Sequence, residues 1–166
     1  MSHYKIYVLK TPEEKISHLT EDEIYEEIKH YASYAEEEEI SVSLLERLKI
    51  DLESTFGTKN VQKNGNCFTI SHAGAIHYFD TMRQKVNIAI QNAMQQPVEN
   101  FIKTDIEHPN WWQIKEMLES NYDSHFYLKD YDGCATRTRF AESVLYLTKK
   151  HGSITLEVTQ VFDFHT

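Results

Sequence analysis

The clearest hydrophobic pattern in the chain lies near its C-terminus, where the alternate positions from 154 to 164 are apolar apart from one glutamine. A period of two is typical of a β-strand with one buried face. Residues 134–148 also contain strand-forming side chains, and the Lys- and Gly-containing stretch 149–153 reads as a turn. We therefore predict a long C-terminal hairpin in which residues 143–149 pair antiparallel with residues 154–163, with a bulge near Glu142.

Other segments repeat apolar residues every three or four positions, which is the period of an amphipathic helix. Capping boxes mark two helix starts, Thr20 with Glu23 and Ser43 with Glu46, and Gly57 marks a helix end. A short helix is also expected directly after Thr11, which Pro12 follows. The four longer helices are predicted over residues 20–35, 44–56, 75–94 and 110–118.

The remaining strand signals are short. The dipeptide Asn64-Gly65 favours a tight hairpin turn, because both residues tolerate positive φ angles. Further strands are expected over residues 3–10, 58–63, 66–71 and 125–129. Short connections between most strands, with the helices grouped in the first half, predict one α+β domain over residues 1–166. It should contain an antiparallel-rich sheet of about five or six strands, with helices packed mainly on one face.

Charge is distributed unevenly over the 166 residues. The formal net charge is −9, and residues 11–56 contain 14 acidic side chains against 4 basic ones. We expect this segment to be helical and to give the molecule one negative side. Nucleic acids and anionic membranes attract clustered Lys and Arg, so neither is expected as a partner, whereas a basic protein surface is. No apolar run reaches the length of a signal peptide or a membrane span, and we expect a cytoplasmic protein.

The most unusual local feature is the run Glu36, Glu37, Glu38 and Glu39, which we call the glutamate run. Carboxylates at a helix C-terminus oppose the helix dipole, so the helix could stop near residue 35 and leave the run in a solvated loop. The other interpretation is a docking patch for a basic partner. Tyr25 and Tyr34 lie outside the expected core stripes, and they are the aromatic anchors we predict for that patch.

A second candidate site is Cys134, Arg137 and Arg139. On a strand the two arginines would share a face and could bind a phosphate or carboxylate, with Cys134 as a nucleophile. An ordinary exposed strand has the same pattern. Cys67 and Cys134 are the two cysteines, and both are expected to be free thiols because nothing indicates export.

The chain contains nine histidines, but no spacing matches a zinc motif. His72 and His77 are five residues apart, which would place them on different sides of a helix. We therefore predict no metal site and no cofactor.

Three functions agree with these patterns. The first is a small acidic protein-binding module, of the inhibitor or immunity type, that docks a basic partner through residues 11–56 and requires only complementary shape and charge. The alternative is a small enzyme that acts on a phosphorylated or nucleotide-like substrate through Cys134, Arg137 and Arg139. The third is a structural subunit that forms homo-oligomers.

Overall fold

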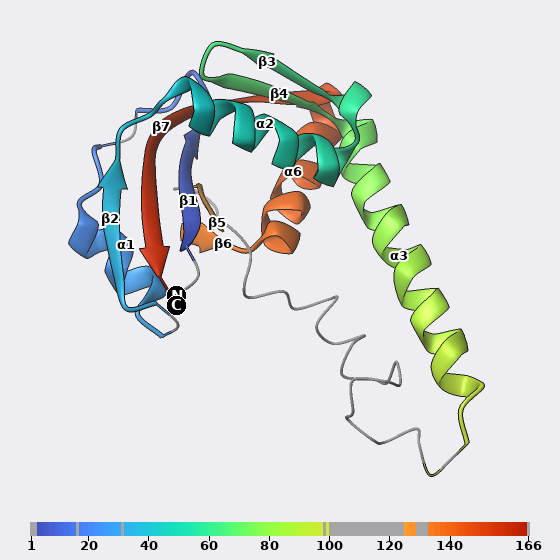
Figure 1. The fold of residues 1–166 in the computed structure, drawn as a ribbon. Coiled ribbons are helices and arrows are strands. Elements are labelled where there is room, and N and C mark those ends of the chain that lie inside the picture. Colours follow the sequence, from blue (N-terminus) through green and yellow to red (C-terminus); the bar gives the residue numbers. More distant parts are fainter. Residues whose placement is uncertain are drawn as a thin grey trace.

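The long strand β7 (Ser153–His165) organises the sheet in the computed structural model of this chain (Figure 1). The structure describes residues 3–15, 17–30, 32–97, 99, 125–128 and 133–165. Along one edge β7 pairs antiparallel with β1 (His3–Lys10), and along the other it pairs first with β4 (Cys67–Ser71) and then with β2 (Tyr34–Glu38). With thirteen residues, β7 is long enough to pair with all three strands.

The remaining strands extend the sheet at its two ends. β3 (Val61–Asn64) pairs antiparallel with β4 across the Asn64-Gly65 turn, as predicted. β5 (His125–Leu128) pairs parallel with β1, and β6 (Gly133–Ala135) pairs antiparallel with β5. The strand order is β3-β4-β7-β1-β5-β6, with β2 beside β7. The expected α+β class and the largely antiparallel sheet are confirmed.

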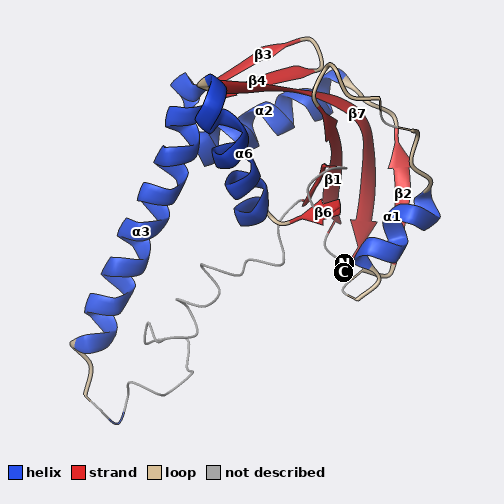
Figure 2. Cartoon of the chain, turned by 180° about the vertical axis from the view of Figure 1, so that it is seen from behind, coloured by secondary structure: helices blue, strands red, loops and turns tan. Residues whose placement is uncertain are grey.

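Helices cover both faces of this sheet, and more of them cover one face (Figure 2). On β1, Tyr7 and Leu9 point into a core with α2 (Val42–Phe56) and α6 (Arg137–His151), whereas Ile6 and Val8 point into a smaller core with α1 (Glu21–Ile28). This alternation of apolar residues toward both sides explains why β1 lacks a clean period of two. α3 (His72–Met94) packs against α2 and α6 near its start and then extends beyond the sheet (Figure 1).

The predicted C-terminal hairpin is wrong in its first half. Residues 137–151 form α6, so β7 pairs with β1, β2 and β4 instead of residues 143–149. Phe140, Ala141, Val144 and Thr148 are buried, and their spacing of three and four gives α6 a helical buried face. The run from Val144 to Leu147 is apolar and aromatic throughout, and a short run of this kind also suits a strand, which is why the local sequence was misread. Gly152 ends α6 in the left-handed conformation, with φ of 77°.

The acidic segment is less helical than predicted. α1 begins at the Thr20 capping box, as predicted, but ends at Ile28 rather than near residue 35. Residues 34–38 form β2, because the backbone of this stretch pairs with the free second half of β7. The helix expected after Thr11 is only a turn, closed by the Glu14 N–H donating to the Thr11 carbonyl.

The other predicted helices lie partly inside and partly outside the described residues. The predicted helices at 44–56 and 75–94 correspond to α2 and α3, and Gly57 ends α2 as predicted. The helix predicted at 110–118 lies outside the described residues. No helix in the described part of the chain is both long enough and apolar enough to span a membrane.

Candidate functional site

The glutamate run lies on an edge strand, neither at a helix end nor in a loop. Glu36, Glu37 and Glu38 belong to β2, and Glu39 follows it directly. Side chains of a strand point alternately to opposite faces, so Glu36 and Glu38 lie on the same face as Tyr34, while Glu37 points toward α1. A run of four like residues is therefore divided between two different surroundings.

Two of the four glutamates are used inside the molecule. Glu38 pairs with Lys5 of β1, with 2.5 Å between the carboxylate and the Nζ atom. Glu37 accepts a hydrogen bond of 3.0 Å from Gln160 Nε2 and lies 3.1 Å from His18 Nε2. Both side chains join β2 to neighbouring segments.

The side chains of the other two, Glu36 and Glu39, are exposed and make no hydrogen bond or ion pair within the described residues. Their charges are therefore not neutralised by a neighbouring cation. Charged side chains on a sheet edge commonly prevent unwanted strand pairing, and this role alone could explain Glu36 and Glu39. The same two carboxylates are also accessible to a binding partner.

The two tyrosines predicted as anchors have different surroundings. Tyr34 is 39% exposed and its ring lies over His165, with 4.4 Å between the ring centroids. Tyr25 is half-buried on α1, where it packs against the smaller core. Only Tyr34 lies beside Glu36 on β2.

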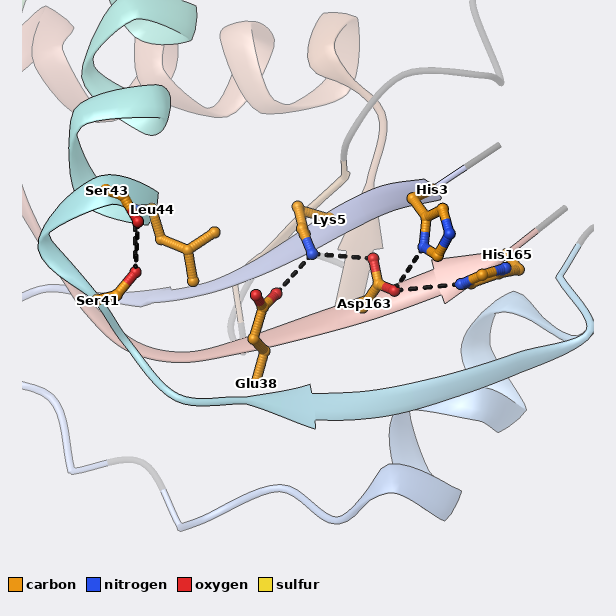
Figure 3. A network of polar contacts seen from close by, with 8 residues as sticks. All are labelled: His3, Lys5, Glu38, Ser41, Ser43, Leu44, Asp163 and His165. Carbon is orange, nitrogen blue, oxygen red and sulfur yellow. Dashed lines mark hydrogen bonds and ion pairs between the residues drawn. The ribbon is translucent and has the colours of Figure 1, made fainter. Parts of the chain in front are cut away.

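Next to β2 lies a polar cluster made by His3, Lys5, Glu38, Asp163 and His165, which we call the Asp163 cluster (Figure 3). The antiparallel register of β1 and β7 places His3 opposite His165 and Lys5 opposite Asp163. Asp163 Oδ2 lies 2.9 Å from His3 Nδ1 and 3.2 Å from His165 Nε2, and Oδ1 accepts a 2.9 Å bond from Lys5 Nζ. Three strands thus contribute to one group.

Contacts within the Asp163 cluster stabilise the charged forms of Asp163 and Lys5. Burial acts to raise the pKa of Asp163, but hydrogen bonds from His3 and Lys5 outweigh burial and hold that pKa below its ordinary value. Burial acts to lower the pKa of Lys5, but Glu38 and Asp163 outweigh it, so the Lys5 pKa is raised. Asp163 is therefore a carboxylate at neutral pH.

The cluster borders an open pocket of about 480 Å³ between β1 and α2. His3, Lys5, Tyr7, Arg47 and Asp51 line it. Burial raises the pKa of Tyr7 to about 12, with a further contribution from the Asp51 charge, so its hydroxyl is neutral and can donate a hydrogen bond. Cationic and anionic side chains both face this space, beside the Tyr7 ring.

The second candidate site does not have the predicted form. Arg137 and Arg139 occupy the first turn of α6, where residues two apart point about 200° away from each other. Arg137 binds Asp51 at 2.6 Å, and Arg139 lies 3.7 Å from Glu142. Cys134 lies in β6, paired with Tyr127 of β5. The prediction that both arginines share a strand face is wrong, because the helix separates them.

No pattern in the sequence predicted that His3, Asp163 and His165 meet. One signal was visible: Asp163 and His165 are two apart on a strand, so their side chains share a face. Nothing local links them to His3, which is 160 residues away from Asp163 and is aligned only by the β1–β7 register.

Comparison with family models, with characterised proteins and with solved structures finds no match.

Proposed function

We propose that this chain is an inhibitor- or immunity-type protein-binding module that docks a basic protein surface along β2 and α1. The observation that carries the proposal is the division of the glutamate run, in which Glu36 and Glu39 are exposed and have no partner within the described residues. Tyr34 offers a partly exposed ring on the same face of β2 as Glu36, and Tyr25 lies on the adjoining helix.

The acidic surface extends from β2 onto α1. The first turn of α1 contains Glu21, Asp22 and Glu23, all exposed. Glu21 reaches β2, where its carboxylate accepts a 2.9 Å hydrogen bond from the Glu37 backbone N–H. This contact places negative charges of the helix and of the strand next to each other. A partner with clustered Lys and Arg matches such a surface by charge.

The contact from Glu21 also determines how a partner can bind. The Glu37 N–H faces away from β7, on the side where an added strand would have to pair, and Glu21 already occupies it. Strand addition is therefore disfavoured at this point of the edge. We expect recognition through side chains, with the carboxylates accelerating encounter and Tyr34 slowing dissociation.

The test compares two variants with equal net charge. Glu36→Gln/Glu39→Gln removes the two unpaired carboxylates of the edge, and Glu99→Gln/Glu142→Gln removes two exposed carboxylates outside residues 11–56. Wild-type protein immobilised at low salt is used to isolate a partner from the lysate of the cell that encodes the chain. Association and dissociation rates of that partner are then measured for all three proteins at two salt concentrations.

We expect the edge variant to associate roughly tenfold more slowly than wild type, with little change in dissociation, and added salt to reduce the difference. The control variant should stay close to wild type. Capture of no protein, or equal association rates for the edge and control variants, would overturn the proposal. The enzyme alternative at Cys134, Arg137 and Arg139 remains a prediction from the sequence.

A further inference from the structure

We propose that His3, Asp163 and His165 form a binding site for a divalent transition-metal ion such as Zn²⁺. One ligand atom from each of the three residues lies within 4.8 Å of the other two. Two imidazoles and one carboxylate are the donors that zinc and non-haem iron sites use when they keep a coordination position open. Calcium and magnesium prefer oxygen ligands and are not expected here.

The distances agree with a shared ion. Two donors that are each about 2.1 Å from a tetrahedral zinc ion lie roughly 3.4 Å apart. Asp163 Oδ2 is 2.9 Å from His3 Nδ1 and 3.2 Å from His165 Nε2. Each of these two distances needs to lengthen by only a few tenths of an ångström to admit the ion, and the two imidazole nitrogens lie within 4.8 Å of each other. His3 can make that adjustment easily, because its side chain is 60% exposed.

The neighbours hold the other two ligands in place. Lys5 binds Asp163 Oδ1, which leaves Oδ2 directed at both imidazoles (Figure 3). His165 is buried, and the Tyr34 ring packs over it. Supporting contacts of this kind orient metal ligands before the ion arrives and strengthen binding. Two of the three ligands are thus positioned on the rigid strand β7.

The site also has an open side. Three protein ligands leave at least one coordination position for water or a small anion. His3 lines the 480 Å³ pocket, which gives solvent a path to the cluster. Arg47 lines the same pocket, and its exposed side chain makes no hydrogen bond or ion pair within the described residues. A metal-bound anion is therefore the ligand class that this pocket would accept.

The alternative is that the cluster is only a polar network, in which Lys5 neutralises Asp163 and both imidazoles are hydrogen-bonded to it. The two cases differ in a measurable way, because a polar network has no need of a metal. Tag-free protein is titrated with ZnCl₂ in a calorimeter. The same protein is titrated with CoCl₂, whose visible absorption spectrum reports the number and type of ligands.

Two variants remove a ligand, His3→Ala and Asp163→Asn, and His151→Ala removes an exposed histidine at the opposite end of β7 as the matched control. We expect one Zn²⁺ per chain, with affinity at least roughly tenfold weaker in both ligand variants and unchanged in His151→Ala. His3 is exposed enough that His3→Ala keeps the fold, so this variant remains decisive if Asp163→Asn is unstable. Cobalt should give the intense bands of a site with four or five ligands in wild type alone.

Absence of Zn²⁺ binding at 100-fold excess, or equal binding by wild type and His3→Ala, would overturn the proposal in favour of the polar network. The site shares no residue with the unpaired carboxylates Glu36 and Glu39. The Glu36→Gln/Glu39→Gln protein should therefore keep its zinc affinity, and His3→Ala should keep the partner association rate. Failure of one proposal leaves the other standing.

Discussion

Gly74 allows the start of α3 to pass close to the end of α2. A β-carbon at this position would lie 2.9 Å from the Asn60 Cβ and 3.1 Å from the Phe56 Cβ. Both atoms sit next to the backbone and cannot move away cheaply. The amide of Gly74 also donates to Ser71, the N-cap of α3, so the tight contact coincides with the first turn of the helix.

We predict that Gly74→Ala destabilises the protein although Ala is the better helix former. Ala gains about 1 kcal/mol of helix propensity over Gly, whereas overpacking a tight contact costs about 1–3 kcal/mol. The free energy of unfolding should fall by about 1 kcal/mol, measured by urea denaturation. Gln84→Ala on the exposed side of α3 is the control and should change stability by less than about 0.5 kcal/mol. A stabilised Gly74→Ala protein would show that α2 and α3 are packed less closely than described.

The sequence alone did not show which glutamates of the candidate site are paired. The glutamate run was visible at once, but its division into paired and unpaired members was not. Strand alternation turns Glu37 toward Gln160, and strand order brings Glu38 to Lys5. Neither partner is near in sequence, so local composition contained no sign of which charges remain free.

At the scale of elements, helix starts and ends were predicted best, because their signals are local. Thr20 caps α1, and Gly57 ends α2 with φ of 88°. The errors concern α6 and β2, whose type depends on distant partners. β2 forms because β7 extends past β4 and offers an unpaired edge, a length that no local pattern in residues 34–38 contains.

One local signal was assigned to the wrong residue. The sequence predicts Ser43 as the N-cap of α2, but Ser41 holds that position and its Oγ accepts a 3.2 Å bond from the Leu44 N–H. Ser43 Oγ lies 2.9 Å from Ser41 Oγ and is exposed. Two serines two residues apart both offer the same side-chain chemistry. Helix geometry selects Ser41, because Val42 already has a helical conformation.

We predict that Ser41→Ala lowers the free energy of unfolding by about 1 kcal/mol, because the Leu44 N–H loses its acceptor. Ser43→Ala loses only an exposed hydroxyl contact and should cost less than about 0.5 kcal/mol. Chemical denaturation of both variants measures the difference. A larger loss for Ser43→Ala would restore the sequence-based assignment of the cap.

At the scale of the whole molecule, the strand order determines which distant residues can meet. It brings His3 and His165 together from opposite ends of the described chain, and it holds other pairs apart. Cys67 lies on β4 and Cys134 lies on β6. Between those strands the sheet contains β7, β1 and β5.

The distance between these two strands bears on the prediction that Cys67 and Cys134 are both free thiols. Four strand spacings of about 4.8 Å place β4 and β6 roughly 19 Å apart, whereas a disulfide requires Cα atoms within about 7 Å. Cys67 is free in the structure. We therefore predict two thiols per chain when protein purified without reductant is denatured and titrated with a thiol reagent, and the same number after treatment with reductant. A count of zero that rises to two on reduction of the monomer would mean that the two cysteines meet, which this strand order forbids.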